Sequence, residues 1–203
     1  VDGAQPGRDE ADAVAARPAA QQPDEPALLG QGYEHGGRDQ RPVLGPAGEG
    51  LEAGRYVVIG LGARRAKKQP TARQVNAWSA AAHARGLATV FMWTPGGGDN
   101  ALYPGDDEAA QEVLASAPAH LHPYRGPLRP AAALAWLAAR SIFPDSGLMH
   151  LAAASPGGVV GLFADTLVSP PPQRWAPLGP RATWLEAPDE VAQLADDRVL
   201  GAL

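Results

Sequence analysis

Short apolar runs alternate with helical patterns from residue 55 to the end of the chain. The run YVVIG (56–60) is β-branched and ends in glycine, which predicts a buried strand. The segment TARQVNAWSAAAHARG (71–86) predicts a helix, because Thr71 and Gln74 have capping-box spacing and a glycine ends the segment. The alternation continues, with strands expected at 87–93, 119–122, 141–144, 158–164 and 182–187, and helices at 106–116, 130–140, 147–154 and 189–194. Such alternation predicts an α/β domain, a Rossmann-like parallel sheet with helices on both faces.

The composition changes sharply before this domain. Residues 1–54 contain no Trp, Phe, Ile, Met or Lys, and Tyr33 is their only Phe, Tyr or Trp residue. Such a segment buries too little apolar surface to offset the entropy of ordering it. We therefore expect two parts: a low-complexity, mostly irregular segment at 1–54, with a short helix near 10–16, and the α/β domain at 55–203. The first part has the composition of a linker or of the remnant of a missing N-terminal domain.

Charge and cysteine content exclude several classes of function. The net charge of −5 gives no reason to expect a nucleic-acid partner. The absence of cysteine excludes disulfides and thiolate metal sites, and is compatible with a cytoplasmic protein. The sequence has no apolar run long enough to cross a bilayer, and its first residues lack a secretory pattern.

Three loops follow predicted strands and are candidates for a ligand site, because ligands of open parallel sheets bind beyond the carboxyl ends of the strands. The loop at 61–70 carries four cations, which suit a phosphate group but also a solvated basic loop: Arg64, Arg65, Lys67 and Lys68. The loop at 94–105 contains TPGGGDN, which lacks the lysine and hydroxyl of a Walker motif and favours a flexible connection. Asp99, Asp106 and Asp107 can reach a ribose hydroxyl, although the last two favour helix capping.

The third loop lies in DSGLMHLAAA (145–154). Ser146 and backbone N–H groups at a helix start can bind an anion, and Gly147 permits close approach of a ligand. Asp145 can hold a hydroxyl group, position a lysine or organise the loop, and His150 follows Gly147 by about one helical turn. An ordinary helix cap with a buried histidine remains the alternative. A serine hydrolase is disfavoured because the nucleophile-elbow glycines are absent, and His120 and His122 lack a third metal ligand.

Four segments in a fixed order carry a family resemblance: YVVIGLGARRAKKQP, WTPGGGDNALYPGDDEAAQEVL, DSGLMHLAAA, and VVGLFADT with RWAPLGP. Over residues 55–195 the series resembles the C-terminal half of glycosyltransferase family 9, the lipopolysaccharide heptosyltransferases. The resemblance implies one half of a GT-B fold, in which the C-terminal domain binds the nucleotide-sugar, typically ADP-heptose. The N-terminal domain of such enzymes binds the lipopolysaccharide-core acceptor.

The resemblance also implies which residues bind the donor. Asp145, Ser146, Gly147 and His150 are expected to line the diphosphate and sugar site. Lys67 stands at the lysine position of the family's K-x-W-P pattern, in which Gln69 replaces the tryptophan. Further candidates are Arg64, Lys68 and Asp99.

Family members invert the anomeric centre without a metal or cofactor. Their general base, a carboxylate, lies in the acceptor domain, and no residue of 1–54 matches it. We therefore expect a complementing acceptor-binding domain or chain, and a cytoplasmic protein, or one peripheral at the inner face of the bacterial inner membrane. Two alternatives stay open: a non-catalytic nucleotide-sugar-binding module or truncated product, and another GT-B enzyme such as a nucleotide-sugar epimerase. The basic loop and RWAPLGP favour the transferase over the epimerase.

Overall fold

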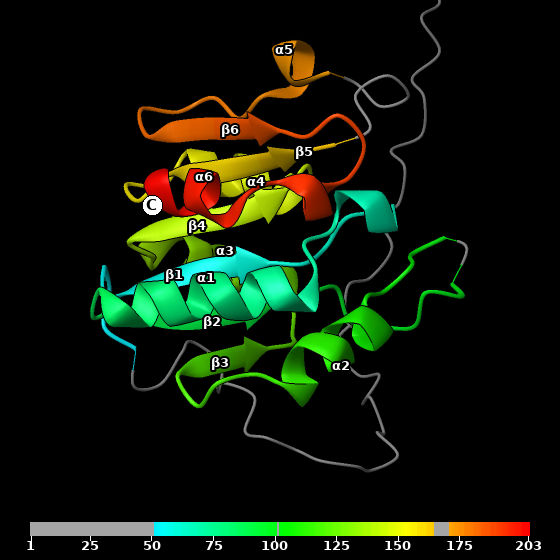
Figure 1. Cartoon of the computed structure of the whole chain (residues 1–203), viewed down its shortest axis with the longest axis horizontal. Helices are drawn as coiled ribbons and strands as arrows, with labels where there is room; N and C mark the ends of the chain where they lie inside the picture. The colour runs from blue at the N-terminus through cyan, green and yellow to red at the C-terminus, as the bar shows by residue number, and fades with distance from the viewer. Residues whose placement is uncertain (1–50, 101, 165–170) are drawn as a thin grey trace, which may run out of the picture. The chain divides into compact units, whose positions relative to one another are not determined.

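The computed structural model describes residues 51–100, 102–164 and 171–203 (Figure 1). Six parallel strands form one sheet in the order β3-β2-β1-β4-β5-β6. The strands are β1 (Tyr56–Gly60), β2 (Ala88–Met92), β3 (Leu121–Tyr124), β4 (Arg140–Pro144), β5 (Val159–Phe163) and β6 (Ala182–Glu186). This strand order is that of the Rossmann fold, so the predicted fold class is confirmed. The predicted irregular segment lies outside the described residues except for 51–54, and its boundary with the domain stays a prediction.

Helices cover both faces of the sheet, as predicted. They are α1 (Ala72–Ala84), α2 (Asp107–Ala115), α3 (Leu128–Leu137), α4 (Gly147–Ala153), α5 (Pro172–Trp175) and α6 (Asp196–Gly201), with 3-10 helices η1 (Ala66–Lys68) and η2 (Val191–Gln193). Helices α1, α2 and α6 pack on the face toward the viewer in Figure 1, and α3 and α4 pack on the far face. Each face therefore has its own apolar core.

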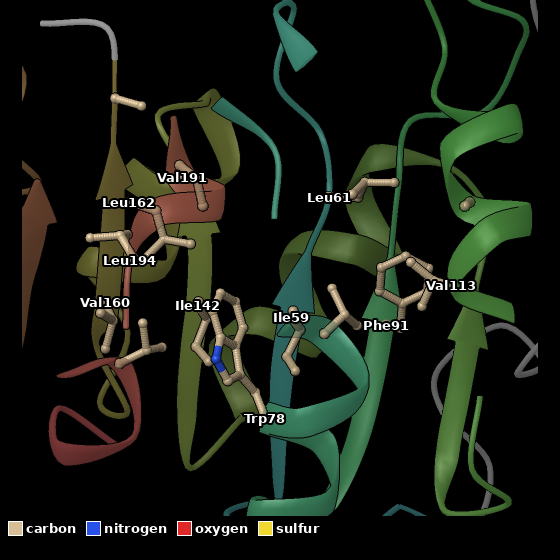
Figure 2. Close-up of a cluster of buried hydrophobic side chains, with 14 of the residues drawn as sticks. Ile59, Leu61, Trp78, Phe91, Val113, Ile142, Val160, Leu162, Val191 and Leu194 are labelled. Atoms are coloured by element: carbon tan, nitrogen blue, oxygen red, sulfur yellow. The ribbon is translucent and has the colours of Figure 1, made fainter. Parts of the chain in front are cut away.

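The core on the α1 face is centred on Trp78, which is fully buried (Figure 2). Its ring belongs to the same cluster as Ile59 of β1 and Ile142 of β4, while its Nε1 donates a hydrogen bond to Asp196 Oδ1 at 2.9 Å. The capping box predicted at Thr71 and Gln74 is present and begins α1. The indole thus buries a large apolar surface and satisfies its one polar group, which fixes α1 against the sheet.

Several predicted elements differ from the structure because long-range contacts prevail over local pattern. Helix α3 ends at Leu137, three residues before the predicted end, and Arg140 begins β4. The buried guanidinium of Arg140 donates to the carbonyls of Ala202, Gly157 and Arg181 and to Thr183 Oγ1, and burial lowers its pKa. These acceptors come from distant segments, so no local pattern could indicate them.

The C-terminal prediction is also wrong in detail. In place of the helix predicted over 189–194 the structure has the short η2, which Glu190 precedes and where Glu190 forms a capping box with Gln193. Helix α6, which was not predicted, follows at Asp196. Strand β3 begins at Leu121 rather than at 119, because Leu121 is the residue in register with Thr89 of β2. His120 therefore precedes the strand.

The central pair β1 and β4 sets the position of the site. From β1 the chain passes to α1 on one face, and from β4 it passes to α4 on the other. Because the two connections diverge, a crevice opens beyond the carboxyl ends of these strands. The three loops singled out in the sequence all begin at this edge.

Candidate functional site

The three predicted loops meet around a cleft of about 710 Å³ at the carboxyl edge of the sheet. One wall comes from residues 62–66, 68 and 69, which follow β1, and another from residues 102–106, 108 and 109 at the start of α2. The first residues after β4 complete it. The candidate residues from the sequence that line the cleft are Arg64, Arg65, Lys68, Asp106, Asp145, Ser146 and Gly147.

An ion pair crosses the cleft between the first and third loops. Lys68 Nζ lies 2.7 Å from Asp145 Oδ2. The side chains are only 10% and 19% exposed, so water screens this pair less than it screens a surface pair. Asp145 therefore binds a lysine, one of the roles predicted for it from the sequence.

A second contact joins the first and second loops. Gln69 Nε2 donates hydrogen bonds to Asp106 Oδ1 at 2.6 Å and to the carbonyl of Ala63 at 2.9 Å. The other carboxylate oxygen of Asp106 accepts the N–H of Thr94 at 3.3 Å. Burial raises the pKa of Asp106, and the hydrogen bonds from Thr94 and Gln69 act in the opposite direction. The predicted capping role of Asp106 is wrong: it precedes α2, but its side chain makes no cap hydrogen bond.

Carboxylates at the start of α2 hold the glycine-rich loop. Asp107 accepts hydrogen bonds from Trp93 Nε1 at 2.8 Å and from the N–H of Gly96 at 3.0 Å. Glu108 accepts the N–H of Gly98. Gly105 passes so close to Gly96 that a β-carbon would lie 2.1 Å from the Gly96 carbonyl oxygen. Hydrogen bonds to Gly96 and Gly98, and the close approach of Gly105 to Gly96, therefore hold the described residues of this loop in place. Its glycine content alone favoured a flexible connection.

The DSG segment carries an unsatisfied hydroxyl. Ser146 precedes α4, a helix of seven residues, and makes no side-chain cap hydrogen bond. Its Oγ is buried and has no hydrogen-bond partner among the described residues. A buried hydroxyl without a partner is rare in folded proteins, and rotation about its side-chain bond would be needed to present it to a ligand. At Gly147 a β-carbon would meet nothing within 4 Å, since that position faces open space.

A second, mainly apolar cavity of about 390 Å³ adjoins the cleft and shares four of its lining residues, Gly62, Thr94, Ser146 and Gly147. Sequence reasoning missed it, because its walls come from elements that are distant in the chain, including β2, β3, α3, β4 and α4. Its large apolar lining residues are Met92, Trp93, Tyr124, Phe143, Leu128, Leu148 and Leu151. One lining residue, Leu128 at the start of α3, is a large apolar residue that the structure leaves exposed.

The remaining predicted residues lie outside both cavities. Lys67 is half exposed, and its Nζ lies 2.5 Å from Asp189 Oδ1. Asp99 and His150 are exposed, so the buried histidine of the helix-cap alternative is wrong. The roles of Lys67, Asp99 and His150 in donor binding stay predictions.

His120 stacks on His83 of α1, with ring centroids 4.1 Å apart. Within the described ranges, no three His, Asp or Glu residues form a group that could hold a metal ion.

The sequence model of Glycosyltransferase family 9 (heptosyltransferase) matches residues 33–198. The chain belongs to glycosyltransferase family 9. The match includes all three cleft loops and the strands that carry them, so the cleft lies within the region that defines the family. A comparison with curated proteins found no match.

Solved structures of family-9 proteins share the fold. They include E. coli heptosyltransferase WaaC with ADP (20% identity, 72% of this chain and 42% of that chain, TM-score 0.60). E. coli ADP-heptose lps heptosyltransferase II matches with 20% identity over 76% of this chain and 47% of that one, at a TM-score of 0.58. A family-9 glycosyl transferase from Veillonella parvula gives 20% identity, 76% and 46% coverage, and a TM-score of 0.60. The family-9 chain described here thus spans less than half the length of each of these structures.

No helix in the described part of this family-9 chain is long and apolar enough to cross a membrane.

Proposed function

We propose that this chain is the nucleotide-sugar-binding part of a family-9 glycosyltransferase, and that its donor is ADP-heptose or a related nucleotide-sugar. The observation that carries the proposal is the pair of adjoining cavities at the carboxyl edge of the sheet. One is lined by Arg64 and Lys68, and the other is mainly apolar. A nucleoside diphosphate has the same two-part chemistry, an anionic diphosphate and a flat apolar base.

The cleft presents three cations, Arg64, Arg65 and Lys68, beside three carboxylates, Asp106, Glu108 and Asp145. The cations suit the diphosphate. A lysine that is mostly shielded from water interacts with a phosphate more strongly than an exposed one does. The buried Ser146 hydroxyl lies where the two cavities meet, and it can bind a ribose or phosphate oxygen. The sugar then extends into the remainder of the cleft.

The apolar cavity suits the nucleobase. Trp93 and Tyr124 supply aromatic surface, and Leu128 and Leu151 supply aliphatic surface that is exposed when no ligand is present. Covering this surface with a base removes apolar area from water, which favours binding. The similar E. coli WaaC was solved with ADP, which supports a nucleoside diphosphate as ligand here.

We propose that the chemical step is transfer of the sugar to a lipopolysaccharide-core hydroxyl with inversion. The acceptor hydroxyl oxygen forms a bond to the anomeric carbon, and the bond between that carbon and the phosphate oxygen breaks. The electron pair of the broken bond leaves with the nucleoside diphosphate. Fixed cations stabilise the charge that develops on this leaving group. We expect them to serve in place of a metal ion, so that EDTA leaves binding and transfer unchanged.

The acceptor hydroxyl must also lose a proton. Asp145 is paired with Lys68, and Asp106 accepts hydrogen bonds from Gln69 and Thr94, so both of these carboxylates are already engaged. We therefore propose that the general base comes from an acceptor-binding domain, in this or another chain. We also propose that the enzyme acts near the inner face of the membrane. The same observation favours a second candidate, a module that binds the nucleotide-sugar without catalysis.

Calorimetric titration of the full chain with ADP, ADP-heptose, UDP and adenosine tests donor binding. We expect ADP and ADP-heptose to bind, and adenosine to bind more weakly because it lacks the phosphates. Failure of every nucleoside diphosphate and nucleotide-sugar to bind would contradict both candidate functions.

Transfer to a lipopolysaccharide-core acceptor is then measured with this chain alone and with an added acceptor-binding domain from another family member. Transfer in either case supports the enzyme. Donor binding without transfer in both cases supports the non-catalytic module.

A further inference from the structure

The loop after β1 carries two adjacent lysines whose ammonium groups lie in different surroundings. Lys67 Nζ lies against Asp189 of the η2 region, with both side chains about half exposed. Lys68 Nζ lies against Asp145 of the cleft, with both side chains largely shielded. Lys68 lines the cleft, and Lys67 lines neither cavity.

The residue that follows the two lysines explains this division. Gln69 stands where the family pattern has tryptophan, and its amide donates to the Ala63 carbonyl and to Asp106. The first bond closes the loop on itself across η1, and the second ties the loop to the start of α2. With Gln69 held in this way, η1 places the preceding residue, Lys68, at the cleft wall. Lys67 is then directed toward η2.

We propose that Lys68, positioned by Asp145, contacts the diphosphate in this chain, in place of Lys67 at the lysine position of the family pattern. The inference rests on the proposed function, since it names the phosphate-binding lysine of that same site. An ammonium can serve more than one acceptor at a time, so the bond to Asp145 and a bond to phosphate are compatible. Lys67 is less suited to bind the diphosphate, because it lines neither cavity and water and salt screen the charge of its half-exposed ammonium.

Asp145 acts on the ligand through Lys68. A carboxylate beside a diphosphate repels it, so Asp145 would weaken binding if its charge were all that mattered. Its bond to Lys68 offsets the desolvation of the ammonium and fixes the direction of the side chain. Pre-orienting the cation lowers the ordering cost of binding. We expect the second effect to prevail, which makes Asp145 a positioning residue.

The test compares Lys68→Met with Lys67→Met in the full chain, titrated with ADP and with adenosine. Loss of one charged hydrogen bond should weaken ADP binding by about tenfold or more in Lys68→Met. Adenosine affinity should stay the same in that variant, because adenosine has no phosphate. Lys67→Met should keep ADP affinity within about threefold. Arg55→Met, at the opposite edge of the sheet, controls for the loss of one positive charge.

Three further variants test the pairing. Lys68→Arg should retain part of the ADP affinity, since a cation remains near the phosphate. Asp145→Asn should weaken ADP binding although it removes a negative charge, and Asp145→Glu should restore part of it. Tighter ADP binding by Asp145→Asn would overturn the positioning role.

Loss of ADP binding in Lys67→Met equal to or greater than that in Lys68→Met would overturn the inference while leaving the proposed function intact. Absence of ADP binding by the unsubstituted chain would instead contradict the proposed function itself. Thermal unfolding of each variant checks that it folds. If Lys68→Met does not fold, Lys67→Met still decides, because retained ADP affinity there supports the inference and its loss refutes it.

Discussion

Arg125 and Asp107 form a two-bond ion pair between the end of β3 and the start of α2. Arg125 Nε donates to Asp107 Oδ1 at 2.9 Å, and Arg125 Nη2 donates to Asp107 Oδ2 at 2.8 Å. The same carboxylate accepts the N–H of Gly96 and the indole N–H of Trp93. Asp107 thus connects a strand end, a helix start and the loop at the cleft, and the hydrogen bond from Arg125 does most to lower its pKa to about 2.

Replacement of Asp107 by Asn should destabilise the protein at pH 7 and have less effect in acid. The folded-state pKa lies below the ordinary value of 3.8, so the ionised carboxylate contributes stability above that pH. This contribution is lost as the pH falls from 3.8 toward 2. After allowance for partial exposure we expect a loss of about 1–2 kcal/mol at pH 7. Urea unfolding at pH 7 and pH 3 measures it, with the exposed Glu112→Gln on α2 as control. Equal losses at both pH values would show that the charge of Asp107 is not responsible.

Replacement of Gln69 by Leu should loosen the cleft. The substitution keeps the approximate size of the side chain but removes the hydrogen bonds to Asp106 and Ala63. A buried carboxylate that loses a donor costs about 1–3 kcal/mol, and its pKa should rise further. We also expect weaker ADP binding because Lys68 is no longer fixed. Gln111→Leu, at an exposed position of α2, is the matched control. Unchanged stability and unchanged affinity would show that Gln69 does not hold the loops together.

Replacement of Gly105 by Ala should displace the glycine-rich loop. The added β-carbon would lie 2.1 Å from the Gly96 carbonyl oxygen, and backbone on both sides must move to relieve the clash. We expect a loss of about 1–3 kcal/mol in urea unfolding. Gly201→Ala is the control, since a β-carbon there meets nothing within 4 Å and α6 favours alanine. If the two substitutions proved equally tolerated, the close approach of Gly105 to Gly96 would have no energetic consequence.

The stacked pair of His83 and His120 should make stability depend on pH near neutrality. Burial lowers the pKa of His120, and the neighbouring His83 lowers it further. The unfolded chain therefore binds a proton near pH 6.5 that the folded chain binds only at lower pH, and stability falls as the pH drops below that value. His120→Phe keeps an aromatic ring on His83 without a titrating group. Urea unfolding at pH 7.5 and 5.5 should show a smaller decrease in this variant. The same decrease in both proteins would assign the effect to other groups.

The sequence predicted those features that depend on residues close together in the chain. Helix α1 begins at Thr71 because Gln74, three residues later, completes the capping box. Strands β1 and β5 lie close to their predicted bounds, because their short β-branched runs fit a sheet that is covered on both faces. Convergence of the three loops followed from one rule of parallel sheets, which needs only the order of strands and helices.

Features that depend on distant partners could not be predicted. The apolar cavity needs β3 and α3 beside α4, and Arg140 joins β4 because its acceptors are carbonyls far away in sequence. The capping prediction for Asp106 failed for the same reason, since Gln69 bonds its carboxylate from 37 residues away.

The sequence by itself determined that this chain forms a parallel α/β sheet and that a cationic loop, a glycine-rich loop and a DSG turn meet at one edge of it. Only the tertiary structure decided which of two adjacent lysines faces the cleft. Lys68 and Asp145 are 77 residues apart, and Lys67 and Asp189 are 122 apart. Neighbouring residues of the same type have the same local preferences, so the difference between them arises from packing between segments that are distant in the chain.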